Sequence, residues 1–292
     1  MRLAVGAVQR PHDLKPMPWN QHPQEEFDLE ATLEAAFAEA TRRYQSRGFQ
    51  RRVGFGRKPA LISVDLANAW TRPGNPFTCE HVDDKIIPSM QKLLASFRKY
   101  NLPVVHVTTC YQITDRKNPH TDMGLWHDKI PVDVVAEKDP NLWAIDSRIA
   151  PIEGEQVLIK KRASAFHGTY LAGYLRAAGV DTILVTGVTA SACVRETICD
   201  GLADGFRTIA VKEAIGDRVP GAVLWNLFDI DAKFGDVETT ERCLQYLDEI
   251  GKNSVRPCTM PKKIASSIID LDSLYVQHEL HEECLAQNQR SS

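Results

Sequence analysis

The chain has 292 residues, of which 43% are hydrophobic and 25% charged, and its formal net charge is −3. These values are typical of a soluble protein long enough to bury a full core, and the charge gives no reason to expect nucleic acid or an anionic membrane as a partner. No apolar run reaches the ~18 residues of a transmembrane helix, and the N-terminus lacks the apolar region of a secretory signal. Seven cysteines without a close CxxC pair indicate reduced thiols, so we expect a cytoplasmic protein without a disulfide framework or a zinc site.

Residues 1–57 predict an N-terminal arm that contains a helix. Residues 1–23 are rich in Pro, His and Gln and lack periodicity, whereas residues 25–44 carry apolar side chains at helical spacing among strong helix formers. The basic, glycine-containing stretch 45–59 predicts a linker with solvated arginines. We expect the helix to pack on a neighbouring element or on another subunit.

Residues 58–250 alternate between apolar runs and amphipathic segments, which predicts a doubly wound parallel sheet with helices on both faces. The polar segment 112–139 between the second and third predicted strands is long for a loop and is typical of a lid or binding loop. Residues 251–292 predict a C-terminal extension, in which 264–285 could form an amphipathic helix. The expected strands and helices are, in chain order, a strand at 60–65, a helix at 83–100, strands at 102–111 and 155–162, a helix at 163–179, a strand at 182–185, a helix starting near 193, a strand at 207–217, a helix from 220, and a short strand followed by a helix to about 250.

Polar residues follow four of the predicted strands. Asp65 ends the first strand, Lys160 and Lys161 close the third, Cys193 begins the helix after the fourth, and Arg218 follows the fifth. Each alone has a structural explanation, such as a turn cap, a solvated side chain or a small buried thiol. Because the carboxyl ends of parallel strands share one edge of the sheet, we expect these side chains to gather there. Only one of the two lysines can point into that site, since successive strand side chains face opposite ways.

Cys193 is the predicted nucleophile. It lies in the first turn of a helix that begins after a tight turn, where unpaired backbone amides and the helix dipole favour a thiolate and could hold an oxyanion. A carboxylate, an ammonium and a thiol at one edge together supply a nucleophile, its base and its electrostatic support. The sequence therefore predicts catalysis by Asp65, Lys160 or Lys161, and Cys193.

Three blocks of the sequence, 60–70 (ALISVDLANAW), 157–171 (VLIKKRASAF, then GTYL) and 187–206 (GVTASACVRETICDGLADGF), resemble the signature blocks of the isochorismatase-like cysteine hydrolases. The resemblance implies a six-stranded parallel sheet, a homo-oligomer with a tetramer favoured, and no metal or organic cofactor. In the family's K-x-R-x-S-A-F pattern the catalytic lysine matches Lys160. The bond from Val188 to Thr189 matches a non-proline cis peptide, which in the family directs the amides corresponding to Thr189 and Cys193 at the oxyanion.

Within the family, segments 65–74 and 214–240 most resemble the N-carbamoylsarcosine amidase branch. That resemblance assigns Arg218 to a substrate carboxylate and Trp70 to substrate binding. It implies hydrolysis of a small carboxylate-bearing amide or ureide, with N-carbamoylsarcosine giving sarcosine, CO2 and ammonia. The metal-binding nicotinamidases have a D-x-H cluster where D-L-A-N-A-W stands here, and the cysteine argues against a true isochorismatase.

Three alternatives remain open at this stage. A maleamate-type or other small-amide amidase would share every feature above. A non-catalytic oligomeric scaffold would not need an acid, a lysine and a cysteine together. An NAD-binding protein predicts G-x-G-x-x-G after the first strand, where the chain has D-L-A-N-A-W.

Overall fold

The computed structural model describes residues 28–112, 122–136 and 139–254. The irregular arm at 1–23, part of the loop at 112–139 and the helix at 264–285 therefore lie outside the described residues. The chain divides into two compact units, Met1–Tyr246 and Leu247–Ser292. The sheet and the site described below belong to the first unit, and the described part of the second is the end of the last helix.

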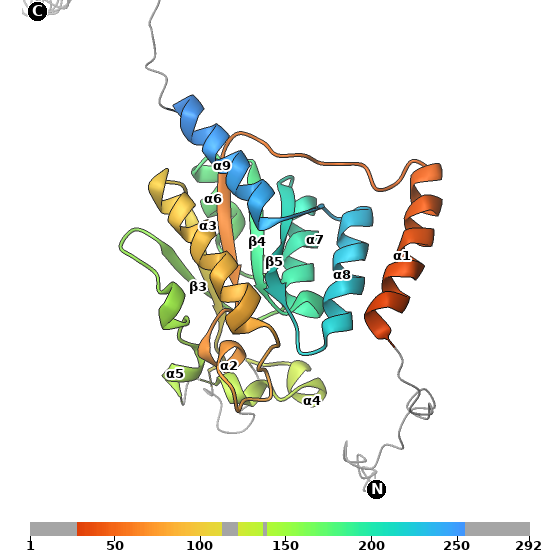
Figure 1. Ribbon diagram of the computed structural model, residues 1–292. Coiled ribbons are helices and arrows are strands. Elements are labelled where there is room, and N and C mark those ends of the chain that lie inside the picture. The colour runs from red at the N-terminus through yellow and green to blue at the C-terminus, as the bar shows by residue number, and fades with distance from the viewer. Residues whose placement is uncertain (1–27, 113–121, 137–138, 255–292) are drawn as a thin grey trace, which may run out of the picture. The chain divides into compact units, whose positions relative to one another are not determined.

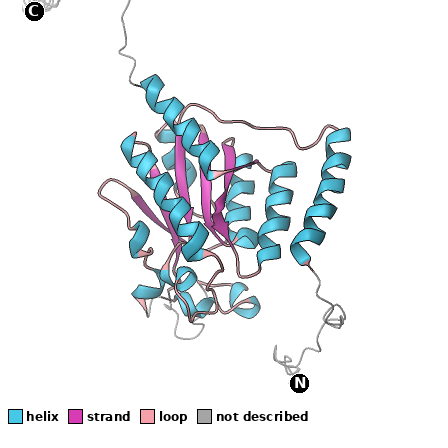
Figure 2. Cartoon of the chain, in the orientation of Figure 1, coloured by secondary structure: helices cyan, strands magenta, loops and turns pink. Residues whose placement is uncertain are grey.

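The described residues form one parallel six-stranded sheet, which confirms the predicted fold class (Figure 2). In the strand order β3-β2-β1-β4-β5-β6, the chain places β2 and β3 on one side of β1 and places β4, β5 and β6 on the other. The topological switch point, where open α/β sheets bind ligands, therefore lies between β1 and β4. The strands are β1 Pro59–Val64, β2 Val104–Thr109, β3 Gln156–Lys160, β4 Thr182–Val188, β5 Arg207–Gly216 and β6 Asp236–Glu238.

Helices cover both faces of the sheet (Figure 1). Helix α3 packs Met90, Leu93 and Phe97 on one face, whereas apolar residues of α6, α7 and α8 form a cluster with the strands on the other. Strands β1, β2 and β4 are buried along their whole length, as apolar parallel strands covered on both faces must be. The helices are α1 Leu29–Ser46, α2 Asn68–Thr71, α3 Ile87–Lys99, α4 Trp126–Lys129, α5 Pro140–Trp143, α6 Leu171–Ala177, α7 Arg195–Ala203, α8 Pro220–Lys233 and α9 Thr240–Ser254.

The N-terminal helix and the linker are both attached to the sheet domain. Helix α1 lies alongside α8 of its own chain, where the rings of Phe37 and Phe228 stack with centroids 4.5 Å apart (Figure 1). The amides of Val53 and Gly54 donate hydrogen bonds to the Asp236 carboxylate at 3.0 and 2.7 Å. Residues 45–59, predicted as a linker with solvated arginines, therefore form an ordered segment (the strap) that is attached to the sheet domain and keeps its arginines exposed.

Helix α6 begins later than the sequence predicts. Instead of starting near residue 163, it starts at Leu171, and the residues before it form turns. The side chains of Ser164 and Thr169 accept hydrogen bonds from the amides of Phe166 and Leu171, at 3.1 and 3.2 Å. Such side-chain partners compete with helical hydrogen bonds, which explains the delayed start.

None of the helices in the described residues is long and apolar enough to cross a membrane.

Candidate active site

The ends of β1 and β4 meet closely because residue 187 is a glycine. Gly187 has a φ of +104°, and a Cβ there would collide with the carbonyl oxygen of Val64. Only glycine tolerates both conditions. Beyond it the Val188–Thr189 peptide bond is cis, and the chain turns into a short helical segment, Ala190–Val194, that carries Cys193. The nucleophile candidate is thereby brought over the end of β1.

The structure brings Asp65, Lys160 and Cys193 into contact. Lys160 Nζ lies 2.9 Å from Asp65 Oδ2 and 3.3 Å from Cys193 Sγ. The same ammonium donates hydrogen bonds to Thr109 Oγ1 at 2.7 Å and to the Arg162 carbonyl at 3.1 Å. The Thr109 hydroxyl in turn donates to Asp65 Oδ1 at 2.9 Å. With Asp65 and Lys160 fully enclosed by protein, this is a desolvated ion pair in contact with a thiol.

One oxygen of this ion pair is placed to accept a proton. Lys160 Nζ lies 2.9 Å from Asp65 Oδ2, and among the described residues no donor meets this oxygen in regular hydrogen-bond geometry. The thiol of Cys193 also interacts with the Asp65 carboxylate. A buried carboxylate oxygen that faces an ammonium and a thiol is a candidate general base. We therefore expect Asp65 Oδ2 to receive the proton of Cys193.

Burial raises the pKa of Cys193 to about 12; Lys160 opposes this shift and Asp65 adds to it. This direction is opposite to the one expected for a thiol at a helix start. The reason is that the cost of removing the thiolate from water exceeds the stabilisation that the ammonium supplies. For Lys160, burial by itself lowers the pKa, because the charged form of a lysine is the protonated one. The interactions with Asp65 and Cys193 outweigh this effect, and the pKa of Lys160 is raised. Both shifts favour a charged lysine and a protonated thiol in the resting site.

A cavity of about 60 Å³ opens over the thiol. Cys193 is partly exposed and lines it. The rings of Trp70 and Phe77 stack on one another with centroids 5.2 Å apart. The walls are mainly aromatic and aliphatic, which keeps water away from the ion pair. Its apolar lining consists of Trp70, Phe77, Tyr111, Trp126, Ile130, Val132, Val135, Ala163 and Ala192.

Two arginines line this cavity, Arg162, which is half-buried, and Arg218, which is exposed. The guanidinium carbon of Arg218 lies 5.9 Å from the ring centroid of Phe77, and the side chain is 38% exposed. Among the described residues, its nearest carboxylate oxygen is Oδ1 of Asp217, which lies 4.0 Å from Nη2, at the limit of an ion pair. Within the described part of the chain, no carboxylate therefore forms a close ion pair with this arginine.

The geometry separates the two candidate lysines. Lys160 points to the thiol, whereas Lys161 Nζ lies 2.6 Å from both Asp122 Oδ2 and the Cys110 carbonyl oxygen. Sequence reasoning missed Thr109, although it ends β2 and the rule applied to the other strand ends would have identified it. It also missed the aromatic wall, since Phe77, Tyr111 and Trp126 lie on separate connecting segments.

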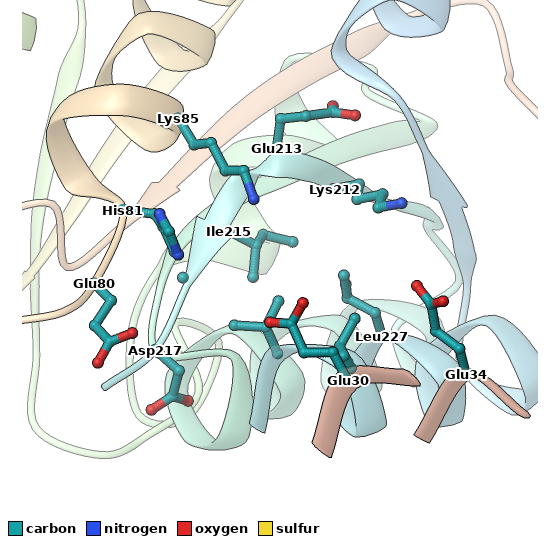
Figure 3. A pocket seen from close by; sticks show the side chains of 13 residues that line it. Glu30, Glu34, Glu80, His81, Lys85, Lys212, Glu213, Ile215, Asp217 and Leu227 are labelled. Atoms are coloured by element: carbon teal, nitrogen blue, oxygen red, sulfur yellow. The ribbon is translucent and has the colours of Figure 1, made fainter. Parts of the chain in front are cut away.

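A larger cavity, about 380 Å³, lies elsewhere between α1, α8 and β5 (Figure 3). Figure 3 shows charged side chains around it, including Glu30, Glu34 and Lys212, with Ile215 and Leu227 on its apolar side. Its charged rim residues are solvent-exposed or half-buried, apart from Asp217. None of the groups in contact with Cys193 lines it. The smaller cavity, which holds the buried ion pair and the thiol, is the candidate active site.

Comparison with known proteins shows which family the chain belongs to. The model of the family described as "Isochorismatase domain" matches residues 59–242. The chain belongs to the isochorismatase family. It is 50% identical over 226 residues to N-carbamoylsarcosine amidase of an Arthrobacter species, covering 77% of this chain and 84% of that protein. It is 43% identical over 200 residues to maleamate amidohydrolase of Pseudomonas putida, covering 68% of this chain and 90% of that protein.

Solved structures of the isochorismatase family share the fold. A cysteine hydrolase from Pseudomonas syringae pv. phaseolicola superposes with a TM-score of 0.62 at 25% identity, covering 69% of this chain and 98% of the other. An N-carbamoylsarcosine amidase from Thermoplasma acidophilum gives a TM-score of 0.50 at 26% identity, covering 63% and 97%. Both alignments extend over nearly the whole length of the solved chain.

Proposed function

We propose that this isochorismatase-family protein is a cysteine-dependent amidohydrolase that cleaves the carbamoyl C–N bond of N-carbamoylsarcosine. The observation that carries the proposal is the contact of the Cys193 thiol with the buried Asp65–Lys160 pair. The 50% identity to an N-carbamoylsarcosine amidase supports the substrate. Arg218 at the same cavity supports a substrate with a carboxylate.

In the first half of the reaction, Cys193 Sγ attacks the carbamoyl carbon while its proton passes to Asp65 Oδ2. The raised pKa of the thiol requires this transfer to accompany the attack, because little thiolate is present beforehand. The Lys160 ammonium stabilises the negative charge as it shifts between sulfur and carboxylate. The amides of Thr189 and Cys193 hold the oxyanion of the tetrahedral intermediate.

The intermediate then breaks the bond between the carbamoyl carbon and its amino group. The proton held on Asp65 leaves with that nitrogen as ammonia, and an S-acyl intermediate remains on Cys193. Water attacks this carbonyl and gives a proton to Asp65; the C–S bond breaks and the sulfur takes the proton back. The released N-carboxysarcosine loses CO2 to give sarcosine. All of these proton transfers use Asp65 in turn as base and acid.

Substrate orientation falls to Arg218 and the aromatic wall. A guanidinium with no close carboxylate partner among the described residues can pair with the substrate carboxylate through two parallel hydrogen bonds. Trp70, stacked on Phe77, offers a flat apolar surface to the N-methyl group. Maleamate is the alternative substrate, because it too combines a carboxylate with an amide and a relative named for its hydrolysis is 43% identical.

The test is ammonia release by the purified protein from N-carbamoylsarcosine, maleamate, biuret and nicotinamide. We expect N-carbamoylsarcosine to have the highest kcat/KM. Cys193→Ala and Cys193→Ser should each lower turnover by several orders of magnitude while leaving the circular dichroism spectrum unchanged, since the covalent route is lost. More than a tenth of wild-type activity in either variant would exclude the thiol mechanism. Highest activity on maleamate would reassign the substrate.

We also propose that the protein is a cytoplasmic homo-oligomer, with a tetramer favoured, and that 58–250 is its catalytic domain. The family resemblance supports the oligomer, and the described cysteines are free thiols, as a reducing compartment requires. Light scattering coupled to size-exclusion chromatography measures the subunit number directly. A monomer at micromolar concentration would contradict the oligomer.

A further inference from the structure

The mechanism above leaves unused a carboxylate that is almost as buried as Asp65. Asp217 follows β5 and is 4% exposed. Its Oδ2 accepts hydrogen bonds from the amide and the hydroxyl of Ser191, at 2.9 and 2.7 Å. Its Oδ1 accepts a hydrogen bond from the backbone amide of Arg218 at 2.8 Å. Three donors from two separate segments therefore converge on this one side chain.

The Ser191 contacts replace a missing helix cap. The helical segment that carries Cys193 begins after Thr189, whose side chain makes no capping hydrogen bond. The first amides of a helix need acceptors, and a carboxylate is among the best of them. Asp217 supplies one from a different strand. The turn that carries the nucleophile is thus tied to the end of β5.

The other contacts of Asp217 lead to further residues that line the active-site cavity. Arg218, the candidate carboxylate-binding residue, is held by its backbone to the same side chain. The carbonyl oxygen of Asp217 accepts a hydrogen bond from the amide of Glu80 at 3.0 Å, which attaches the segment carrying Phe77. Figure 3 shows Asp217 and Glu80 next to each other at one edge of the larger cavity.

We propose that Asp217 is a positioning residue that sets the distance between the Cys193 thiol and the Arg218 guanidinium. This proposal rests on the proposed function, in which the thiol attacks the carbamoyl carbon and the arginine binds the carboxylate. The distance between those two groups then selects substrates by the number of atoms between carbamoyl carbon and carboxylate. Asp217 touches no substrate and acts through the two segments it joins.

The decisive measurement compares N-carbamoylsarcosine with its homologue one methylene longer, N-carbamoyl-N-methyl-β-alanine. Asp217→Asn keeps the size of the side chain but leaves one oxygen to serve donors that now use two. We expect kcat/KM for N-carbamoylsarcosine to fall by about tenfold to a hundredfold, the range for a misplaced reacting group. The preference for the shorter substrate should narrow by at least tenfold.

Asp236→Asn is the matched control. Asp236 is 1% exposed and also accepts two backbone amides, those of Val53 and Gly54, but it lies at the strap and does not line the active-site cavity. This variant should lose stability and keep the wild-type substrate ratio. A ratio within twofold of wild type in Asp217→Asn, or an equal change in both variants, would overturn the proposal.

The Ser191→Ala variant and hydrogen exchange test the same contacts of Asp217 independently. Where Asp217→Asn does not fold, Ser191→Ala removes one of the two hydrogen bonds to Oδ2, and an unchanged ratio in that variant would overturn the proposal. Wild-type protein that hydrolyses neither compound would refute the proposed function instead. Hydrogen exchange in 187–194 then decides the anchoring: faster exchange in Asp217→Asn than in Asp236→Asn supports it, and equal exchange rejects it.

Discussion

The active-site cavity and the cavity beside α1 differ in where they hold their charges. The smaller one encloses an ion pair at the bottom of aromatic walls, with both partners fully buried. The larger one has mostly solvent-exposed or half-buried charged residues over an apolar side (Figure 3). A charge in water costs nothing to keep, whereas a buried charge persists only when it is paired. The desolvated groups therefore favour the smaller cavity as the candidate active site, whereas cavity volume alone would favour a different one.

The largest expected effect comes from breaking the buried pair. Lys160→Met leaves the Asp65 carboxylate without its cation, a change that typically costs about 3–5 kcal/mol of stability. Turnover should fall by about a thousandfold or more, since neither the carboxylate nor the developing thiolate keeps its electrostatic support. Urea unfolding and ammonia release measure the two effects. Wild-type turnover in a folded Lys160→Met protein would mean that the pair is structural.

A smaller effect is expected at the cavity's arginine. Hydrogen bonds to a charged group contribute roughly 1.5–3 kcal/mol, so Arg218→Met should lower kcat/KM by roughly tenfold to several hundredfold for N-carbamoylsarcosine. For an uncharged N-alkylurea of similar size, kcat/KM of the variant should stay close to the wild-type value. Arg218→Lys keeps the charge without the planar fork, so its kcat/KM for N-carbamoylsarcosine should lie between the values of the wild type and of Arg218→Met. Equal losses on the charged and the neutral substrate would remove the argument for a carboxylate.

Two buried thiols, Cys79 and Cys243, and the partly exposed Cys193 predict how stability depends on pH. Burial raises the pKa of Cys79, Cys193 and Cys243 from 9.0 to about 12. A group whose pKa is raised on folding binds its proton more tightly in the folded state, so its contribution is complete below pH 9 and is lost as pH rises towards 12. The free energy of unfolding in urea should fall between pH 9 and 11, and less steeply in Cys193→Ala. A flat profile over this range would contradict the assigned burial.

The smallest effect is expected in the larger cavity. Lys212→Ala and Glu34→Ala remove exposed charges that line it and lie outside the active-site cavity. Exposed charges contribute little to stability, and substitutions of this kind usually change it by less than about 0.5 kcal/mol. We expect kcat/KM to stay within twofold of wild type in both variants. A tenfold loss in either would show that this cavity takes part in the reaction.

The sequence by itself determined the fold class and which residues reach the edge of the sheet. Apolar runs of strand length, separated by helical periodicity, are local patterns that backbone geometry converts into a parallel sheet. The ends of its strands must share one edge, so Asp65, Lys160 and Cys193 could be assigned to a common site before any contact was known. The family motif selects Lys160 over Lys161, and in the structure the Lys160 ammonium lies 3.3 Å from the Cys193 thiol.

Only the tertiary structure decided the properties that depend on the whole environment of a side chain. A helix start predicted a lowered pKa for Cys193, but enclosure by several elements raises it instead. The aromatic wall combines Phe77, Tyr111 and Trp126 from separate segments, and Asp217 caps a helix to which it is not adjacent in sequence. Periodicity carries information over one strand or one turn of helix, whereas burial and distance are sums over the entire fold. Burial and distances between residues far apart in the sequence are therefore defined only once the chain has folded.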